Sequence, residues 1–249
     1  MKVGIIGFGN LGRALAAGLI KSGHDGTELF VCEADPDCLA LAKEKPYCAT
    51  ASDDVNFVIR NSDLIFFVIK SYVFEEISTL VDRSGFEGKT VVSFMAGVTF
   101  DLIYSLLGNV RLVRAMPSLG IASCDGVIGY TESPKAVAEI FHKLGYAFEV
   151  KPDEIEKVMA LSGCGLGFAA YLIDALSAAG GTMGFSPDVC AAIAAKTFQN
   201  AIDRGDFRET MCAVATKGGA TEQGIRHMDG SGVYTIVADA VRKAYERMT

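Results

Sequence analysis

The chain has 249 residues, of which 50% are hydrophobic and 21% are charged, and its formal net charge is −7. This composition supports a sizeable core in one large or two small domains, and the negative charge disfavours nucleic acids and anionic membranes as partners. No apolar run approaches the roughly 20 residues that span a bilayer, so no membrane partner is expected. The seven cysteines contain no CxxC pair, which predicts reduced thiols in a cytoplasmic protein. The three histidines lie at no metal-ligand spacing, so no metal site is expected.

The first 35 residues predict a nucleotide-binding unit. Residues 2–6 (KVGII) are an apolar run typical of a strand, and a helical apolar pattern follows residue 10. Between them lies a GxGxxG turn with the spacing of a dinucleotide fingerprint. Its first glycine permits the tight turn, its second lets the backbone approach a pyrophosphate, and its third lets helix and strand pack closely. We therefore expect cofactor binding by Gly7, Phe8, Gly9, Asn10, Leu11 and Gly12; the alternative is a glycine turn that binds nothing.

An acidic residue ends the second predicted strand, residues 28–32. Glu33 follows Gly12 by 21 positions, where a carboxylate can accept both ribose hydroxyls of NADH and repel a 2′-phosphate. Asp35 competes for this role. Because Asp35 precedes Pro36, it is better interpreted as the N-cap of a helix over residues 36–45. The sequence thus favours Glu33 as the ribose ligand and NADH over NADPH.

Strand-type and helix-type segments then alternate up to residue 150. Ser52, Thr99 and Ser133 are the predicted caps of helices that end near residues 60, 107 and 144. The predicted strands cover residues 63–69, 89–95, 109–116, 126–131 and 146–150. This alternation predicts an α/β fold with a doubly wound, mostly parallel sheet over residues 1–150. Ligands of such sheets bind beyond the carboxyl ends of the strands, so the strand-end residues should gather round one crevice, among them Lys70, Ala96, Gly97 and Met116.

Residues 151–249 contain no convincing strand and predict an all-helical second domain. The expected helices cover residues 154–161, 166–179, 187–203, 208–216 and 234–248, with glycines at 163–167 and 180–181 as breaks. Apolar helices in so small a domain indicate burial against another subunit, hence a homodimer or larger assembly. A self-contained bundle packed on the first domain is the alternative.

A glycine pair flanked by threonines lies at residues 215–225. Such a turn exposes consecutive backbone amides, to which Thr216 and Thr221 add hydroxyl donors, and this is the chemistry of a small carboxylate site. An ordinary junction between two helices is the alternative interpretation.

Six motifs together resemble the pyrroline-5-carboxylate reductase family. They occur in the family's order: GFGNLG at 7–12, VIKS at 68–71, MAGV at 95–98, RAMPSLGIA at 114–122, SGCGLGF at 162–168 and TKGGAT at 216–221. Several positions depart from the family's pattern, namely Ser71, Ser118, Gly120, Cys164, Leu166, Thr216 and Lys217. The glycines and Thr221 remain.

The resemblance implies a Rossmann-type domain followed by a helical dimerisation domain. It also implies hydride transfer from NADH or NADPH to the C=N bond of 1-pyrroline-5-carboxylate, a cyclic imino acid, giving L-proline. Thr221 would hydrogen-bond the ring nitrogen and act as the catalytic residue. Further residues implied at the cofactor and substrate are Val68, Ser162, Cys164, Thr216, Lys217, Gly218, Gly219 and Ala220.

Three functions stay open at this point, and the first is the reduction of 1-pyrroline-5-carboxylate. The second is a reductase of the same fold that acts on another cyclic imine or a 2-oxo acid, with which the drifted motifs are compatible. The third is a regulatory paralogue that binds nucleotide without catalysis. Lys217 strengthens carboxylate binding, selects a dianionic substrate, or points into solvent.

Overall fold

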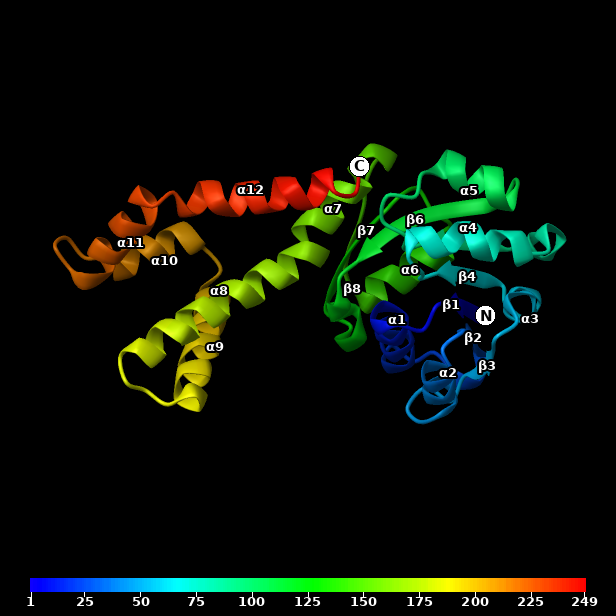
Figure 1. The fold of residues 1–249 in the computed structure, drawn as a ribbon, viewed down its shortest axis with the longest axis horizontal. Coiled ribbons are helices and arrows are strands. Elements are labelled where there is room, and N and C mark those ends of the chain that lie inside the picture. The colour runs from blue at the N-terminus through cyan, green and yellow to red at the C-terminus, as the bar shows by residue number, and fades with distance from the viewer. The chain divides into compact units, whose positions relative to one another are not determined.

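The structure, a computed structural model, describes residues 1–249 and contains one eight-stranded sheet (Figure 1). The strand order is β3-β2-β1-β4-β5-β6-β7-β8. All strands lie in the first 149 residues, and only helices follow. The strands are β1 Val3–Ile6, β2 Leu29–Cys32, β3 Thr50–Ser52, β4 Leu64–Phe67, β5 Thr90–Ser93, β6 Arg111–Pro117, β7 Gly126–Tyr130 and β8 Gly145–Glu149.

Strands β1 to β6 are parallel, and this places their carboxyl ends along one edge of the sheet. Strand β7 runs antiparallel to β6, and β8 is parallel to β7. The run from β6 to β7 passes only through the 3-10 turn η3, Leu119–Ser123. A connection this short cannot make a parallel crossover, so the chain must reverse direction. The predicted mostly parallel, doubly wound sheet is confirmed.

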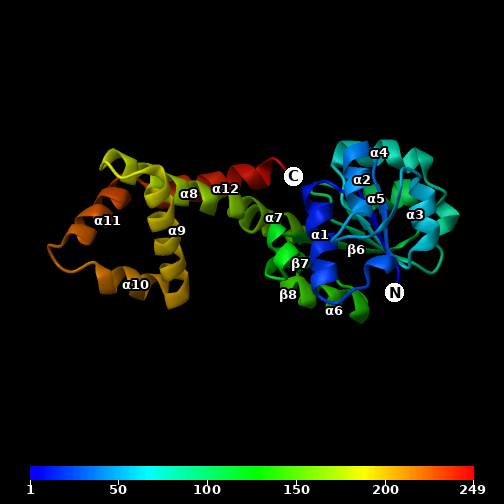
Figure 2. The same cartoon turned by 90° about the horizontal axis from the view of Figure 1, so that it is seen from below.

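Helices cover both faces of the sheet, as Figures 1 and 2 show. Helices α1 (Asn10–Lys21), α2 (Pro36–Lys43) and α6 (Lys135–Leu144) bury apolar side chains in one core cluster with β1, β2 and β4. Helices α3 (Val55–Asn61), α4 (Ser71–Leu80) and α5 (Phe100–Leu107) pack in a second cluster on the other face. Helix α7 (Ile155–Leu161) adds a small third cluster with Met116 of β6. Because helices cover both faces of the sheet, the central strands are buried on both sides and are apolar throughout.

Two of the predicted helix caps are confirmed. The Asp35 carboxylate accepts from the amides of Asp37 and Cys38, and Thr99 Oγ1 accepts from the amide of Leu102. The other two are wrong. Residue 52 ends the short edge strand β3, which leaves Asp54 to cap α3, and Pro134 occupies the N-cap position of α6 in place of Ser133.

The chain divides into two compact units. The first comprises Met1–Gly163 together with Tyr245–Thr249, and the second comprises Cys164–Ala244. The division into two domains near residue 150 stays a prediction; the boundary between the two compact units lies at residues 163 and 164. The helices of the second unit are α8 Gly163–Thr182, α9 Pro187–Arg204, α10 Phe207–Val214, α11 Ala220–Gly230 and most of α12 Val233–Glu246.

The predicted breaks in the helical half are confirmed only in part: α7 ends before Ser162, and α8 ends at Thr182, just before a turn that contains Gly184. Gly163, Gly165 and Gly167 lie in the first turns of α8, and the pair at 180–181 lies in its last turn. As a result, a helical run over Pro152–Thr182, of 31 residues and mean hydropathy 1.5, is long and apolar enough to cross a membrane by length and composition alone. The expectation that no apolar stretch has this length is therefore wrong, because a helix tolerates glycine at about 1 kcal/mol each.

Candidate active site

The glycine turn lies at the carboxyl end of β1, and the structure shows what each glycine does. A Cβ on Gly12 would lie 2.1 Å from the carbonyl oxygen of Gly7, so only glycine lets α1 start this close to the strand. Gly7 has φ +99°, and a Cβ there would meet the carbonyl of Val68 at 2.6 Å. Gly9 faces open space, with nothing within 4 Å of a Cβ position. Its open side is where a pyrophosphate would approach.

The amino-terminal end of α1 is open to an anion. Gly9 is the N-cap residue and no side chain caps the helix, so the first-turn amides of Asn10 and Leu11 have no intramolecular acceptor. The Asn10 side chain does not cap the helix; its Oδ1 accepts from Arg13 Nη2 at 2.5 Å. Free amides and the positive end of the helix dipole form a site for phosphate. Such local donors are needed because the chain as a whole carries a net negative charge.

Glu33 lies directly beside this turn. Its carboxylate accepts from the amide of Phe8 at 2.6 Å through Oε2, and from the amides of Ala34 and Asp35 at 2.8 and 3.0 Å through Oε1. Three amide donors fix the carboxylate at the end of β2, next to the glycine turn. Asp35 caps α2 through its Oδ1, as the sequence predicted.

The remaining predicted cofactor residues follow β4, β5 and β6 at the same edge. Val68 continues β4, and Lys70 is the N-cap residue of α4, without a side-chain cap bond. Ala96 and Gly97 follow β5, and Gly97 has φ +71°. Met116 is 1% exposed within β6. The sheet thus brings together residues that lie more than 100 positions apart in the chain.

The glycine–threonine loop lies in the second unit, immediately before α11. The amide of Gly218 donates to Glu222 Oε2 at 2.6 Å, and the amide of Gly219 donates to the Thr216 carbonyl at 2.8 Å. Glu222 in turn pairs with Arg226 at 3.0 Å. The two glycine amides predicted to hold a carboxylate are therefore engaged within the loop.

The free donors of this loop are the amides that begin α11. Gly219 is the N-cap residue and no side chain caps the helix, so the amides of Ala220 and Thr221 lack an intrahelical acceptor. Thr221 is exposed in the first turn, and its hydroxyl makes no hydrogen bond within the protein. Thr221 does not cap this helix, because the N-cap residue, Gly219, lies two positions before it.

Ser162 and Cys164 lie at the junction between α7 and α8. The Ser162 hydroxyl donates to the Val158 carbonyl at 2.8 Å, so its proton is already used. Cys164 is half-buried in the first turn of α8. Lys217 is exposed and makes no ion pair. All seven cysteines are free thiols.

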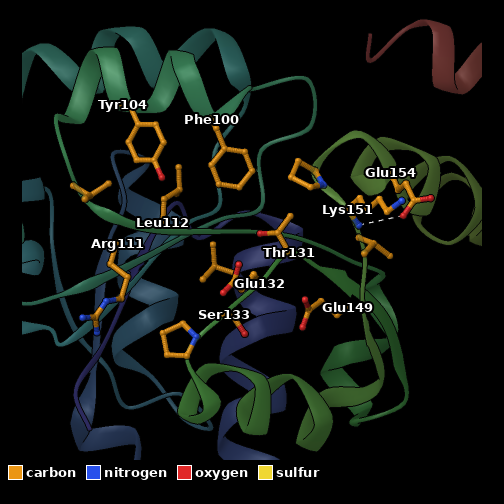
Figure 3. A pocket seen from close by; sticks show the side chains of 15 residues that line it. Phe100, Tyr104, Arg111, Leu112, Thr131, Glu132, Ser133, Glu149, Lys151 and Glu154 are labelled. Carbon is orange, nitrogen blue, oxygen red and sulfur yellow. Dashed lines mark hydrogen bonds between the residues drawn. The ribbon is translucent and has the colours of Figure 1, made fainter.

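A cavity of the first unit lies apart from these residues. It measures about 1000 Å³ and is lined by Phe100 and Tyr104 of α5, by the start of β6, and by residues after β7 and β8 (Figure 3). At one side of it the Lys151 amide donates to Glu154 Oε2 at 3.1 Å, the hydrogen bond drawn in the figure. None of the predicted site residues lines it, since it lies among the amino-terminal part of β6 and the ends of the two antiparallel strands.

Comparison with known proteins gives the family. A family model described as pyrroline-5-carboxylate reductase dimerisation matches residues 152–249, and one described as NADP oxidoreductase, coenzyme F420-dependent, matches residues 2–97. A pyrroline-5-carboxylate reductase of Aquifex aeolicus is 30% identical, over 99% of this chain and 96% of the relative. The chain belongs to the pyrroline-5-carboxylate reductase family.

Solved structures of this family share the fold. A pyrroline-5-carboxylate reductase from Coxiella burnetii, 25% identical, has a TM-score of 0.84 and covers 99% of this chain and 97% of its own. The Plasmodium falciparum pyrroline carboxylate reductase with NADP bound is 20% identical, with a TM-score of 0.89, and covers 100% and 97%. The family resemblance stated from six short motifs is confirmed over the full length.

Sequence reasoning missed the two acidic residues that organise the family motifs. Glu222 holds the loop at residues 216–219, and Glu156 of α7 pairs with Arg114 of the RAMP motif. Glu222 had a signal, because a glutamate three residues after an N-cap position is the spacing of a capping box. Glu156 had none, since its partner lies 42 residues away.

Proposed function

We propose that this protein reduces 1-pyrroline-5-carboxylate to L-proline with NADH or NADPH. The observation that carries the proposal is 30% sequence identity, over 99% of this chain, to a pyrroline-5-carboxylate reductase. The glycine turn supports it, because its geometry leaves Gly9 and the first amides of α1 open to a pyrophosphate. Bound cofactor supplies the hydride. The protein supplies the phosphate site, the ribose site and the loop that binds the imino acid.

We infer that Glu33 selects NADH. Its carboxylate lies between the glycine turn and α2, fixed by three amides, where the adenosine ribose of a dinucleotide is bound in Rossmann folds. Ribose hydroxyls can donate to this carboxylate. A 2′-phosphate would place two negative charges together in a partly desolvated site, which is unfavourable.

The substrate carboxylate is assigned to the start of α11. The amides of Ala220 and Thr221 and the hydroxyl of Thr216 are the donors offered there, at the positive end of the helix. The amides of Gly218 and Gly219 serve to hold the loop in this conformation. Lys217, exposed beside them, adds a positive charge that favours an anionic substrate.

Thr221 is assigned to the ring nitrogen. A cyclic imine that receives hydride gains electron density on nitrogen, and a hydroxyl at hydrogen-bond distance stabilises that change. Because the protonated imine is already electrophilic, positioning supplies much of the rate acceleration. A strong acid–base pair is not needed, which agrees with the absence of carboxylate or histidine pairs in the loop.

We place the assembly at a homodimer or larger, in the cytoplasm. The dimerisation family model covers residues 152–249, and the second unit exposes many large apolar side chains. On α8 these include Leu166, Tyr171, Leu172 and Leu176. Contact with a second copy would bury this surface and account for a run of membrane-like hydropathy. Seven free cysteines support a reducing compartment.

The test is the loss of NADH absorbance with 1-pyrroline-5-carboxylate, beside a panel of other cyclic imines and 2-oxo acids. The proposal expects 1-pyrroline-5-carboxylate to have the highest kcat/KM and proline to be the product. A higher kcat/KM for another imine or a 2-oxo acid would assign the drifted motifs to a changed substrate. Tight NADH binding without turnover of any compound would favour the regulatory alternative.

A further inference from the structure

A buried ion pair joins the sheet to the first helix of the dimerisation region. Arg114, in the middle of β6, donates through Nη2 to Glu156 Oε1 of α7 at 2.6 Å. The two side chains are only 4% and 12% exposed. Taking both charges out of water costs several kcal/mol per ion, so such a pair adds little to stability compared with apolar side chains of the same size.

The same guanidinium reaches the end of β5. Arg114 Nη2 donates to the carbonyl of Met95 at 3.3 Å, while its Nε is buried without a partner. The main chain of Arg114 is fixed as well, since its amide donates to Thr131 Oγ1 at 3.0 Å. The guanidinium is thus held where it meets one carboxylate and one carbonyl, and its remaining hydrogen-bonding capacity is left unused.

Met95 begins the turn that leads to Ala96 and Gly97, and the carboxyl-terminal segment lies close to Gly97. A Cβ on Gly97 would lie 2.9 Å from the carbonyl oxygen of Met248, in the last residues of the chain, which belong to the first unit. Residues 95–97 therefore lie between the Arg114 guanidinium and the carboxyl-terminal segment. They also follow β5 at the edge of the sheet where the cofactor is expected.

We propose that Arg114 and Glu156 are positioning residues for the nicotinamide end of the cofactor site. Glu156 fixes the guanidinium, the guanidinium fixes the Met95 carbonyl, and residues 95–97 form the surface at the end of β5 on which the nicotinamide lies. Neither residue contacts substrate or cofactor. The inference rests on the proposed function, because only hydride transfer is sensitive to a small displacement of the nicotinamide.

Two variants separate positioning from stability. In the double variant Arg114→Met/Glu156→Leu, apolar side chains of similar size replace both charges, so the thermal midpoint is retained or raised. In Glu156→Gln the acceptor oxygen stays but the negative charge is lost, so the thermal midpoint falls because the buried guanidinium has no counter-ion. The exposed Arg111 of the same strand provides the matched control, Arg111→Met.

The measurements are the thermal midpoint, the Kd for NADH from the fluorescence of bound cofactor, kcat, and the isotope effect with NADH deuterated at the transferred position. The double variant should keep its thermal midpoint and lose kcat by about 10- to 100-fold, the scale of a displacement near 1 Å. Its isotope effect should rise as hydride transfer becomes rate-limiting. Glu156→Gln should be less stable and should lose less kcat than the double variant, because its side-chain oxygen can still accept from Arg114, and Arg111→Met should match wild type in every readout.

A double variant that folds and turns over within twofold of wild type would overturn the proposal. Should the double variant fail to fold, Arg114→Lys decides, because both contacts are made from Nη2 and a flexible lysine stem does not fix an ammonium at that position as the planar guanidinium does. A kcat equal to wild type in Arg114→Lys would also overturn the proposal, and a loss of tenfold or more would support it. If the wild type itself reduces no imine, the proposed function fails, whereas an active wild type beside a fully active double variant overturns the positioning alone.

Discussion

The amide of Phe8 donates to Glu33 Oε2 at 2.6 Å, and this bond joins the glycine turn after β1 to the end of β2. The residue that we propose to select the cofactor is therefore also bonded to the turn that we propose to bind its phosphates. Charge and geometry can be separated in part by substitution, because serine removes the charge and all three amide contacts, whereas glutamine removes the charge but keeps one acceptor oxygen.

Replacing Glu33 should shift the preference between NADH and NADPH. In Glu33→Ser, the ratio of kcat/KM for NADH to that for NADPH should fall at least tenfold, about 1.4 kcal/mol, because a 2′-phosphate is no longer repelled. Glu33→Gln should show the same shift with a smaller loss of NADH affinity, since its amide oxygen can still accept from Phe8. A wild-type enzyme that already prefers NADPH tenfold would show that Glu33 does not set the preference.

Two glycines of the same turn should respond differently to alanine. Gly9→Ala meets no neighbouring atom, so it should cost about 1 kcal/mol of stability or less, as an N-cap change, while weakening NADH binding at least tenfold. Gly12→Ala places a Cβ 2.1 Å from a backbone carbonyl, so it should lower stability by about 1–3 kcal/mol or more. Urea unfolding and NADH titration of both variants provide the test. Equal effects on both quantities would contradict the assigned roles.

Thr221 should affect turnover without affecting stability. Since Gly219 is the N-cap of α11, Thr221→Val removes no cap and should leave the thermal midpoint nearly unchanged. The loss of a hydroxyl that stabilises the transition state should lower kcat/KM by roughly ten- to a thousandfold. Thr221→Ser keeps the hydroxyl and should retain most activity. Full activity in Thr221→Val would make this residue structural.

Cys32 should be inert to alkylation and should limit stability at high pH. Burial, followed by the nearby Glu33 charge, raises the pKa of the Cys32 thiol to about 12. A group with a raised folded-state pKa stabilises the protein below its unfolded pKa, about 8.5, and this contribution is lost as the pH rises toward 12. The free energy of unfolding should therefore fall between pH 8.5 and 11 by more in wild type than in Cys32→Ala. Mass spectrometry after iodoacetamide at pH 8 should find the exposed Cys48 and Cys212 modified and Cys32 unmodified.

The apolar face of α8 should control assembly. Leu176 is 43% exposed within the second unit, and a carboxylate there would have to be buried on association. Leu176→Glu should shift light-scattering mass from dimer or larger toward monomer at micromolar concentration. Leu80→Glu, at an exposed apolar residue that ends α4, should leave the mass unchanged. A monomeric wild type would end the proposal of a homo-oligomer.

Local patterns in the sequence determined most of the fold. Short apolar runs bounded by glycine, proline and capping residues located seven of the eight strands, and the caps at Asp35 and Thr99 were found because each acts on amides two or three residues away. The glycine turn and Glu33 were found for the same reason, since strand, turn and helix follow each other directly. Parallel strands then had to bring their carboxyl ends to one edge.

Only the tertiary structure decided features that depend on partners distant in sequence. The strand β3 has three residues of mixed polarity, and it exists because β2 offers an edge with which to pair. The glycines of α8 form helix although local propensity disfavours them. Arg114 and Glu156 meet 42 residues apart, and Gly97 meets a carbonyl at the end of the chain. Sequence reasoning detects the periodicity and capping that act within a turn or two, whereas a long-range pair leaves no local pattern, because its energy depends on packing that exists only after folding.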